Sequence, residues 1–254
     1  MKIKAALLLS SSLAACGAAL AQAPAPAPAP YEISYNVGAV TDYRYRGLSQ
    51  SAKRPALQGG VDLALANGFY LGAWGSTIRW IKDSSAPSLR GPLEIDVYGG
   101  YKGEFAGLSY DVGALQYWYP RNTLKNVTGE NADTFELYGA VGFGPATVKY
   151  SHALTTLFGV PNSKNSGYLD LSASFDLGGG FTLVPHVGWQ KIRNFGIYRD
   201  YSLAVAKDFS GFMVSGAVVG TNWEDRFGAP ATLVGSGNRD LGKPGLVLGV
   251  KTTF

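Results

Sequence analysis

Charged side chains recur at every second position in several parts of this chain, which is the spacing that places them on one face of a β-strand. Asp42, Arg44 and Arg46 form the first such set. The other candidates for an inward face are Glu94, Asp96, Glu136, Lys149, Asp170, Asp176 and His186. In an enclosed polar space these residues would line an ion-selecting constriction, or they would form an ion-pair network that fills the interior. The spacing leaves both alternatives open.

The two histidines are the candidates for acid–base chemistry. His186 is expected to face the same interior, whereas His152 shares a face with Val148 and Tyr150. A lipid hydrolase needs a histidine with a nearby serine nucleophile and an orienting polar group. Ser151 is adjacent to His152 but on the opposite face of a regular strand, so the two cannot pair. The spacing therefore predicts no catalytic residues and a protein that is not an enzyme.

Metal, cofactor and nucleic-acid binding lack supporting motifs. The only cysteine is Cys16, and no His or Cys spacing predicts a metal site. No glycine-rich phosphate loop opens a helix, so no cofactor is expected. Tyr43, Arg44, Tyr45 and Arg46 interleave aromatic and basic residues as single-strand nucleic-acid binders do. Strand alternation explains this run, with tyrosines toward lipid and arginines toward a lumen, and no nucleic-acid partner is expected.

The composition indicates which elements hold these residues. Hydrophobic residues make up 46% of the chain and charged residues only 16%, against about 25% charged residues in soluble domains. Aromatic residues reach 13%, and there are 34 glycines. A chain rich in aromatics and glycine but poor in charge suits many strands joined by tight turns. No segment after the N-terminus has the apolar length that a transmembrane helix requires.

Alternation of apolar and polar residues recurs in runs of about ten residues, the length of a tilted transmembrane strand. In the clearest run, Leu169, Leu171 and Leu177 face one way while Asp170 and Asp176 face the other. The runs are 33–46, 55–66, 69–79, 93–102, 108–119, 133–143, 146–156, 167–177, 181–191, 198–208, 212–223 and 245–254. They predict an all-β fold, a transmembrane antiparallel up-and-down β-barrel of twelve strands, with ten or fourteen strands as alternatives.

The connections between the runs alternate in length. Short, turn-rich connections fall at 67–68, 103–107, 144–145, 178–180 and 210–211. The mostly longer, polar connections fall at 47–54, 80–92, 120–132, 157–166, 192–197 and 224–244. Outer-membrane barrels of Gram-negative bacteria have short periplasmic turns and long external loops. If both termini are periplasmic, the six longer connections all lie outside the cell.

The N-terminal segment is expected to direct export. Residues 1–21 have a basic start, a short apolar core and small residues before a cleavage point after Ala21, as signal peptides do. Leu13 to Cys16 resembles the lipobox of bacterial lipoproteins, so processing at Cys16 is the alternative. Residues 22–30 form an Ala/Pro-rich linker that should be stiff. The outer-membrane barrel is expected over 31–254.

The final strand ends in an aromatic residue. Leu246, Leu248 and Val250 alternate with small or polar residues up to Phe254. Outer-membrane proteins commonly end this way, and their assembly machinery reads such a strand, so Phe254 is the predicted assembly signal. Other large aromatics fall near strand ends, where rings suit the two membrane interfaces. Pro185 removes a ladder donor, which predicts a bulge in its strand.

Several stretches resemble the TorF-like family of proteobacterial outer-membrane porins, long labelled conserved hypothetical. They are VTDYRYRGLSQS at 40–51, PALQGGVD at 55–62, GFYLGAWGS at 68–76, EIDVYGGY at 94–101, GLSYDVG at 107–113, YLDLSAS at 168–174 and GFTL at 180–183. The resemblance covers nearly all of the chain after the linker. It implies an outer-membrane, channel-like barrel and no particular substrate.

The predicted function is passive or weakly selective passage of small solutes or ions through a polar lumen. The expected partners are outer-membrane lipid, the barrel assembly machinery and the passing solutes. If the lumen is open, Arg44 and Arg46 should favour anions locally. Two alternatives remain: an outer-membrane barrel enzyme that acts on lipid, with His152 as its base, and a soluble periplasmic β-barrel that binds a ligand.

Overall fold

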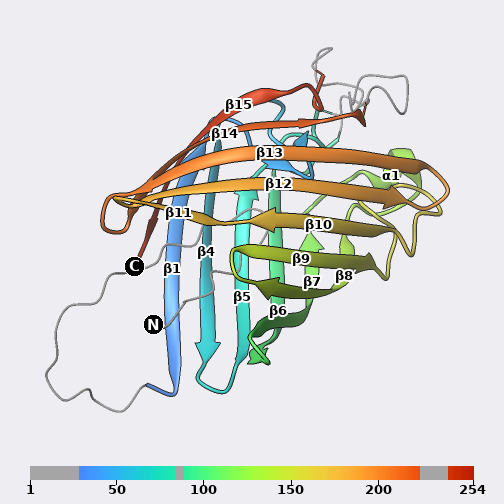
Figure 1. The fold of residues 1–254 in the computed structure, drawn as a ribbon. Helices are drawn as coiled ribbons and strands as arrows, with labels where there is room; N and C mark the ends of the chain where they lie inside the picture. Colours follow the sequence, from blue (N-terminus) through green and yellow to red (C-terminus); the bar gives the residue numbers. More distant parts are fainter. Residues whose placement is uncertain (1–28, 84–88, 224–239) are drawn as a thin grey trace, which may run out of the picture.

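The computed structural model describes residues 29–83, 89–223 and 240–254, and their strands form one closed antiparallel barrel (Figure 1). The strands of its wall are β1 (Tyr31–Val40), β4 (Ala56–Leu65), β5 (Phe69–Thr77), β6 (Leu93–Phe105), β7 (Leu108–Trp118), β8 (Thr134–Phe143), β9 (Ala146–Ala153), β10 (Gly167–Ala173), β11 (Phe175–Gly178), β12 (Phe181–Ile192), β13 (Gly196–Asp208), β14 (Phe212–Thr221) and β15 (Gly245–Thr253). Because β10 and β11 both pair with β12 as parts of one strand, the barrel has twelve strands. The alternation predicted this number.

Each strand of the wall pairs with the next one along the chain, and the first pairs with the last. Val37 of β1 lies opposite Thr252 of β15. The ladder continues to Tyr35 and Phe254, because the Tyr35 amide donates to the Phe254 carbonyl at 2.7 Å and the Phe254 amide donates to the Tyr35 carbonyl at 2.9 Å. Closure lets the described strands of the wall pair on both sides, except β11, which pairs with β12 alone.

The connections alternate in length as predicted, except that 193–195 is as short as the turns 66–68 and 209–211. The short turns 66–68, 106–107, 144–145, 179–180 and 209–211 share one end of the barrel, the turn end. The other end, the loop end, holds the connections 41–55, 78–92, 119–133, 154–166, 193–195 and 222–244. The structure describes these connections except for residues 84–88 and 224–239. The segment 119–133 contains the short helix α1 (Lys125–Thr128). Among the described residues, no helix has the length and apolar character to cross a membrane.

The two faces of the wall differ in polarity. Outward-pointing residues in the middle of the strands are apolar and exposed, as Val37 on β1, Leu137 on β8 and Leu203 on β13 show. Inward-pointing residues include buried charged side chains, such as Glu136 on β8 and Asp200 on β13. An apolar exterior around a polar interior is the arrangement of barrels that lie in lipid.

Aromatic side chains gather at both ends of the outer face. Near the turn end, the Phe69 and Tyr101 rings pack edge to face with centroids 5.0 Å apart. Phe143, beside the turn 144–145, and Phe254 are exposed. Trp118 is exposed at the loop end of β7. These positions match the aromatic girdles that flank the apolar band of membrane barrels.

The first predicted strand is too long. The alternation predicts a strand over 33–46, but β1 ends at Val40 and residues 41–55, here called the inner loop, fold into the barrel. The inner loop contains a short hairpin of β2 (Arg44–Tyr45) and β3 (Leu48–Ser49). Arg46 and Gly47 reverse the chain with φ angles of 45° and 79°. Tyr43 and Tyr45, which the alternation directs toward lipid, therefore lie inside.

The effect of Pro185 also differs from the prediction. β12 is continuous, and Pro185 stays in register opposite Leu203 of β13. Proline has no amide to donate, and the strand on the other side is interrupted at Ser174, between β10 and β11. The irregular register falls further along that strand, between Asp176 and Gly178. The missing amide of Pro185 thus coincides with the interruption between β10 and β11, while β12 itself stays regular.

Candidate functional site

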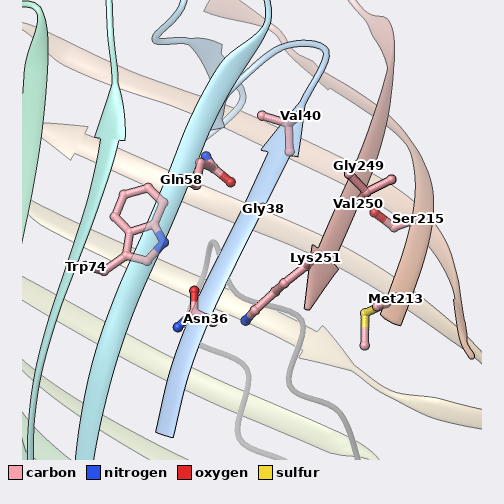
Figure 2. Close-up of a pocket in the computed structure, with 10 residues that line it drawn as sticks. All are labelled: Asn36, Gly38, Val40, Gln58, Trp74, Met213, Ser215, Gly249, Val250 and Lys251. Atoms are coloured by element: carbon pink, nitrogen blue, oxygen red, sulfur yellow. The ribbon is translucent and has the colours of Figure 1, made fainter. Parts of the chain in front are cut away.

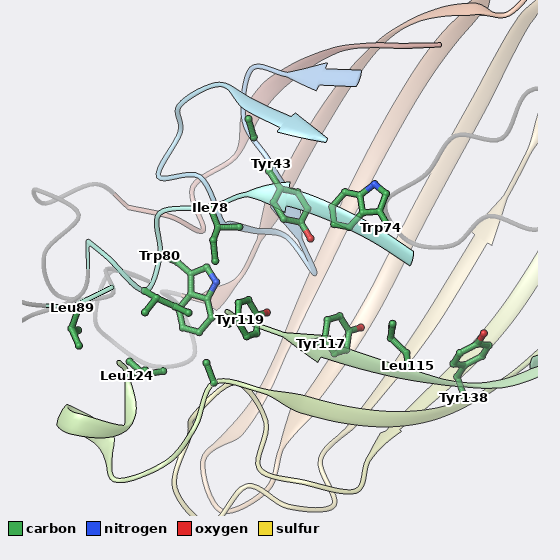
Figure 3. Packing of buried hydrophobic residues seen from close by; sticks show 13 residues of the cluster. Tyr43, Trp74, Ile78, Trp80, Leu89, Leu115, Tyr117, Tyr119, Leu124 and Tyr138 are labelled. Carbon is green, nitrogen blue, oxygen red and sulfur yellow. The ribbon is translucent and has the colours of Figure 1, made fainter. Parts of the chain in front are cut away.

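The inner loop packs across the interior of the barrel near the loop end. Its Tyr43 ring meets Trp74 of β5 edge to face at 5.5 Å, and its Tyr45 ring meets Tyr117 of β7 at 5.6 Å. Phe158, from the connection 154–166, packs against both Tyr45 and Tyr117. The same buried cluster includes Ile78, Trp80, Leu89, Leu115, Tyr119, Leu124 and Tyr138 (Figure 3). Apolar and aromatic packing fills this part of the lumen.

Asp42 and Arg44 hold the inner loop in shape and against the last connection. Arg44 Nε donates to Asp42 Oδ2 at 2.5 Å. Arg44 Nη1 donates to the backbone oxygens of Leu241 at 3.1 Å and Lys243 at 3.2 Å. The Ser49 hydroxyl donates to Asp42 Oδ1 at 2.5 Å. Asp42 and Arg44 therefore hydrogen-bond to each other and to groups of the inner loop and the last connection, and these bonds hold the inner loop in place.

Arg46 ties the inner loop to the wall. Its Nη2 donates to both carboxylate oxygens of Glu136 on β8, at 2.7 and 3.0 Å, and its Nη1 donates to Gln190 Oε1 on β12 at 2.5 Å. The guanidinium carbon lies 4.8 Å from the Tyr45 ring centroid and 4.3 Å from that of Tyr168. Burial lowers the pKa of Arg46, but the Glu136 carboxylate and the Tyr45 and Tyr117 hydroxyls together raise it by more, so the pKa lies well above its ordinary value.

Tyrosine hydroxyls donate to many of the carboxylates of the wall. The pairs are Tyr43 to Glu94 at 2.6 Å, Tyr70 to Asp111 at 2.6 Å, Tyr98 to Asp62 at 2.5 Å and Tyr168 to Asp200 at 3.1 Å. Burial, with the neighbouring Glu94 carboxylate, raises the pKa of Tyr43 well above its ordinary value, so this hydroxyl keeps its proton. Hydrogen bonds to carboxylates are among the stronger ones in proteins. Three of these carboxylates lie on β4 to β7, and the fourth pair joins β10 and β13.

His186 of β12 forms a network with Tyr168, Asp170 and Asp200, here called the wall network. Its Nε2 lies 2.8 Å from Asp170 Oδ2 and 3.1 Å from the Tyr168 hydroxyl, and its Nδ1 lies 3.7 Å from Asp200 Oδ1. Connected buried polar groups of this kind order one another. The structure therefore brings His186 and Asp170, two of the sequence candidates, into direct contact.

A cavity of about 60 Å³ lies beside the aromatic cluster, where β14, β15, β1, β4 and β5 meet (Figure 2). Its lining residues are Asn36, Gly38, Val40, Gln58, Trp74, Met213, Ser215, Gly249, Val250 and Lys251. Glycine keeps this space open, since a Cβ on Gly249 would lie 2.8 Å from Ser215 Oγ and one on Gly60 would lie 3.1 Å from Asn36 Nδ2. The cavity has room for several water molecules.

A family model described as "Bacterial protein of unknown function (Gcw_chp)" matches residues 24–254. The chain belongs to the Gcw_chp family. The match includes all of the barrel and thus every residue of the inner loop, the wall network and the cavity. No curated protein matches this Gcw_chp chain.

Two solved porin structures are similar to the Gcw_chp barrel. One is "KdgM porin in complex with disordered oligogalacturonate", with a TM-score of 0.52 and 10% identity over 87% of this chain and 98% of that one. The other is "NanC porin structure in rhombohedral crystal form.", with a TM-score of 0.50 and 8% identity over 88% of this chain and 99% of that one. At these identities the likeness shows a shared barrel fold.

The remaining sequence candidates of the Gcw_chp chain lie in different surroundings. Asp96 on β6 is buried, and within the described residues its Oδ1 has no hydrogen-bond partner. Lys149 on β9 places its ammonium 4.1 Å from the centroid of the Tyr138 ring. Asp176 lies at the turn end, where its carboxylate accepts the Gly178 amide at 2.8 Å. Asp176 therefore caps a turn and stands apart from the network.

Several residues of the Gcw_chp site were not predicted from the sequence. Gln190 and Tyr168 contact Arg46, Asp200 contacts Tyr168, and Lys251 lines the cavity. All four occupy inward positions of predicted strands, so alternation alone could have included them. Gln190 and Tyr168 carry no full charge, so the alternation of charged residues does not mark them.

The Gcw_chp barrel does not present a hydrolytic arrangement around His152. The Tyr150 hydroxyl lies 3.4 Å from His152 Nδ1, while Ser151 is buried and belongs to the other face of β9. Within the described residues, no three His, Cys, Asp or Glu side chains are grouped so that they could hold a metal ion. The interior offers hydrogen bonds, charge and space for water, which suits the passage or retention of small polar species.

Proposed function

We propose that this Gcw_chp protein is an outer-membrane porin through which small solutes or ions diffuse. The observation that carries the proposal is the cavity lined by Asn36, Gln58, Ser215 and Lys251 inside a barrel with an apolar exterior. An exposed apolar belt suits a lipid environment, and it argues against the alternative of a soluble periplasmic barrel. The turn end then faces the periplasm, and the loop end faces outward.

The passage follows the wall formed by β14, β15, β1 and β4. The inward positions Gly38, Gly60 and Gly249 carry no side chain there, and Ser215 carries a small one. Across from this wall, the inner loop and its aromatic cluster occupy the lumen. The inner loop therefore acts as the constriction, and the passage is narrow.

The polar lining of the cavity indicates the class of solute. The KdgM porin forms a complex with oligogalacturonate. In this barrel the cavity has polar side chains and room for several water molecules, so the proposal names ions and small polar solutes. The resemblance to the TorF-like porins supports a channel as well.

Export and assembly complete the proposal. A signal peptide at 1–21 would carry the chain across the inner membrane, with cleavage after Ala21 or lipoprotein processing at Cys16; both positions lie outside the described residues. The barrel assembly machinery would then read the final strand and Phe254. This route supplies the lipid contact that the apolar belt requires.

Single-cysteine variants test the passage, because the only cysteine of the chain is Cys16, in the predicted signal peptide. Ser215→Cys places a thiol in the cavity. The matched control is Gly216→Cys, on the opposite face of β14, where a Cβ would meet Leu248 Cδ2 at 3.5 Å.

The purified barrel should conduct ions across a planar bilayer. A charged methanethiosulfonate reagent should lower the conductance of Ser215→Cys and leave Gly216→Cys unchanged. A correctly folded wild-type barrel that does not conduct would overturn the proposal. Equal blockage of the two variants would refute the assigned route.

A further inference from the structure

The strands β9, β10, β12 and β13 lie side by side (Figure 1). Polar side chains gather at the loop end of their outward face. The register places His152 of β9 opposite Gly167 of β10, and Gly167 opposite Lys191 of β12. Arg199 of β13 lies opposite Trp189, two positions from Lys191. We call the residues Tyr150, His152, Lys191 and Arg199 the rim patch. Alternation puts all four on the outward face.

The two basic residues of the rim patch lie near each other without an acidic residue between them. Lys191 and Arg199 are both exposed, and diagonal neighbours on paired strands lie about 7–8 Å apart. Within the described chain neither forms an ion pair. Asp200, next to Arg199 in sequence, is buried on the inner face. Like charges this close repel one another, so the patch favours an anionic ligand.

Gly167 shapes the space between the two sides of the patch. A Cβ on Gly167 would collide with the Tyr150 hydroxyl, so the phenol of Tyr150 leans across β10 where a side chain is missing. Its hydroxyl also lies 3.4 Å from His152 Nδ1. The Tyr150 hydroxyl, a hydrogen-bond donor, thus lies over Gly167, between His152 and Lys191. Four donor groups thus share one small region of the rim.

The surroundings of the patch match the level of lipid headgroups. Trp189 lies opposite Arg199, and the exposed Ile197 lies opposite Lys191. Aromatic rings of this kind sit at the boundary between acyl chains and headgroups. Basic side chains at this level meet the phosphate oxygens of lipids, to which Arg and Lys bind by charge-assisted hydrogen bonds.

We propose that the rim patch binds the phosphate groups of anionic lipid in the outer leaflet. This inference rests on the outer-membrane placement given under the proposed function. Lys191 and Arg199 neutralise the phosphate, and Tyr150 and His152 donate further hydrogen bonds. His152, the candidate catalytic base of the lipid-enzyme alternative, is thereby assigned to lipid binding.

The test uses the purified full-length barrel in a neutral detergent, titrated with lipid A, with phosphatidylcholine or with inorganic phosphate. The variant is Lys191→Gln combined with Arg199→Gln. The matched control is Lys207→Gln at the turn end of β13, whose ammonium donates to the Gly179 carbonyl at 3.0 Å and lies 3.9 Å from the Phe181 ring centroid. Native mass spectrometry measures bound lipid, and the thermal unfolding midpoint reports its effect.

Lipid A should bind the wild type and the Lys207→Gln control alike. A basic residue near an anionic lipid surface contributes about 1 kcal/mol, so the double variant should bind lipid A about thirtyfold more weakly. Equal binding by wild type and double variant would overturn the inference. So would an equal response to inorganic phosphate, or the appearance of cleaved lipid that depends on His152.

Conductance separates this inference from the proposed function. The double variant changes only the outer face, so in phosphatidylcholine bilayers it should conduct like the wild type. A wild-type barrel that binds lipid A but does not conduct would support lipid binding by the rim patch and would contradict the porin proposal.

Discussion

Arg46 and Glu136 lie 90 positions apart in the chain and form a two-pronged ion pair inside the barrel, with Arg46 Nη2 at 2.7 and 3.0 Å from the two carboxylate oxygens. The side chains are only 3% and 2% exposed. Removing one partner of a buried pair leaves the other charge uncompensated, which is more costly than removing both. The pair is therefore a sensitive point at which to test the role of the inner loop.

Arg46→Ala should release the inner loop from the wall and leave Glu136 unpaired. We expect the free energy of unfolding to fall by about 3–5 kcal/mol and the single-channel conductance to rise. The double variant Arg46→Met with Glu136→Leu removes both charges, so it should recover much of the stability while keeping the higher conductance. A folded Arg46→Ala barrel with wild-type conductance would show that the loop does not constrict the passage.

Lys251 should set the charge preference of the passage. Arg44 and Arg46 are each paired with a carboxylate, so their effect on a passing ion is smaller than their spacing in the sequence predicts. Lys251→Gln should shift the reversal potential in a salt gradient toward cations. Lys149→Gln is the control, because its ammonium lies against the Tyr138 ring and outside the cavity lining. Equal shifts in the two variants would contradict this assignment.

Deleting Phe254 should lower the amount of folded barrel in the membrane. The deletion removes the two backbone hydrogen bonds to Tyr35 and the ring that stacks on the Tyr35 ring at 6.1 Å. Heat-modifiable migration of membrane fractions in gels measures the folded amount at low expression. Phe254→Tyr keeps the ring and the backbone bonds, so it should assemble normally. Wild-type levels of the deletion variant would count against the assembly role.

Gly188→Ala should weaken the wall network. A Cβ on Gly188 would collide with the Tyr168 hydroxyl, which contacts both His186 and Asp200. Overpacking of this kind costs about 1–3 kcal/mol, measurable by urea unfolding. The control is Gly139→Ala, where a Cβ would meet nothing within 4 Å. If both alanines leave stability unchanged, the fit of Tyr168 against β12 is less tight than the structure indicates.

The wall of the barrel could be predicted because the alternation of polar and apolar residues is a local signal: the type of each residue indicates which face of the strand it occupies. In the run 167–177, Asp170 is buried inside and Leu177 is exposed, as the pattern requires. Glycines and other turn residues indicated the short connections, and the residues left between the remaining pairs of strands gave the longer connections. The same signal predicted that His186 would face the interior, where it meets Asp170.

The inner loop could not be predicted, because Tyr43 to Arg46 alternate as a strand would. Their placement depends on distant partners, since the Tyr43 hydroxyl donates to Glu94 and Arg46 pairs with Glu136. Arg46 also adopts a positive φ of 45°, which is uncommon for a residue other than glycine. Only Gly47 signals a turn locally.

The cavity escaped prediction for a different reason. Asn36, Gln58 and Ser215 come from three separate runs and become neighbours only when the barrel closes. Each is an ordinary polar residue at an inward position. No single run shows that the glycines at 38, 60 and 249 face the same space. The order of strands around the closed wall was needed to see it.

The pairing of β1 with β15 has a consequence for the timing of folding. The Leu248 amide donates to Thr41 Oγ1 across 207 positions of the chain. Contacts between such distant residues form slowly, because the entropy of closing the loop is lost before the contact compensates for it. Pairs of strands that are neighbours in the chain can form earlier. The free edge of β1 can pair only after the last strand, β15, with its nine residues, is in place. Maturation of this protein should therefore be limited by one late ring-closing step, and its rate should depend little on substitutions in the middle of the chain.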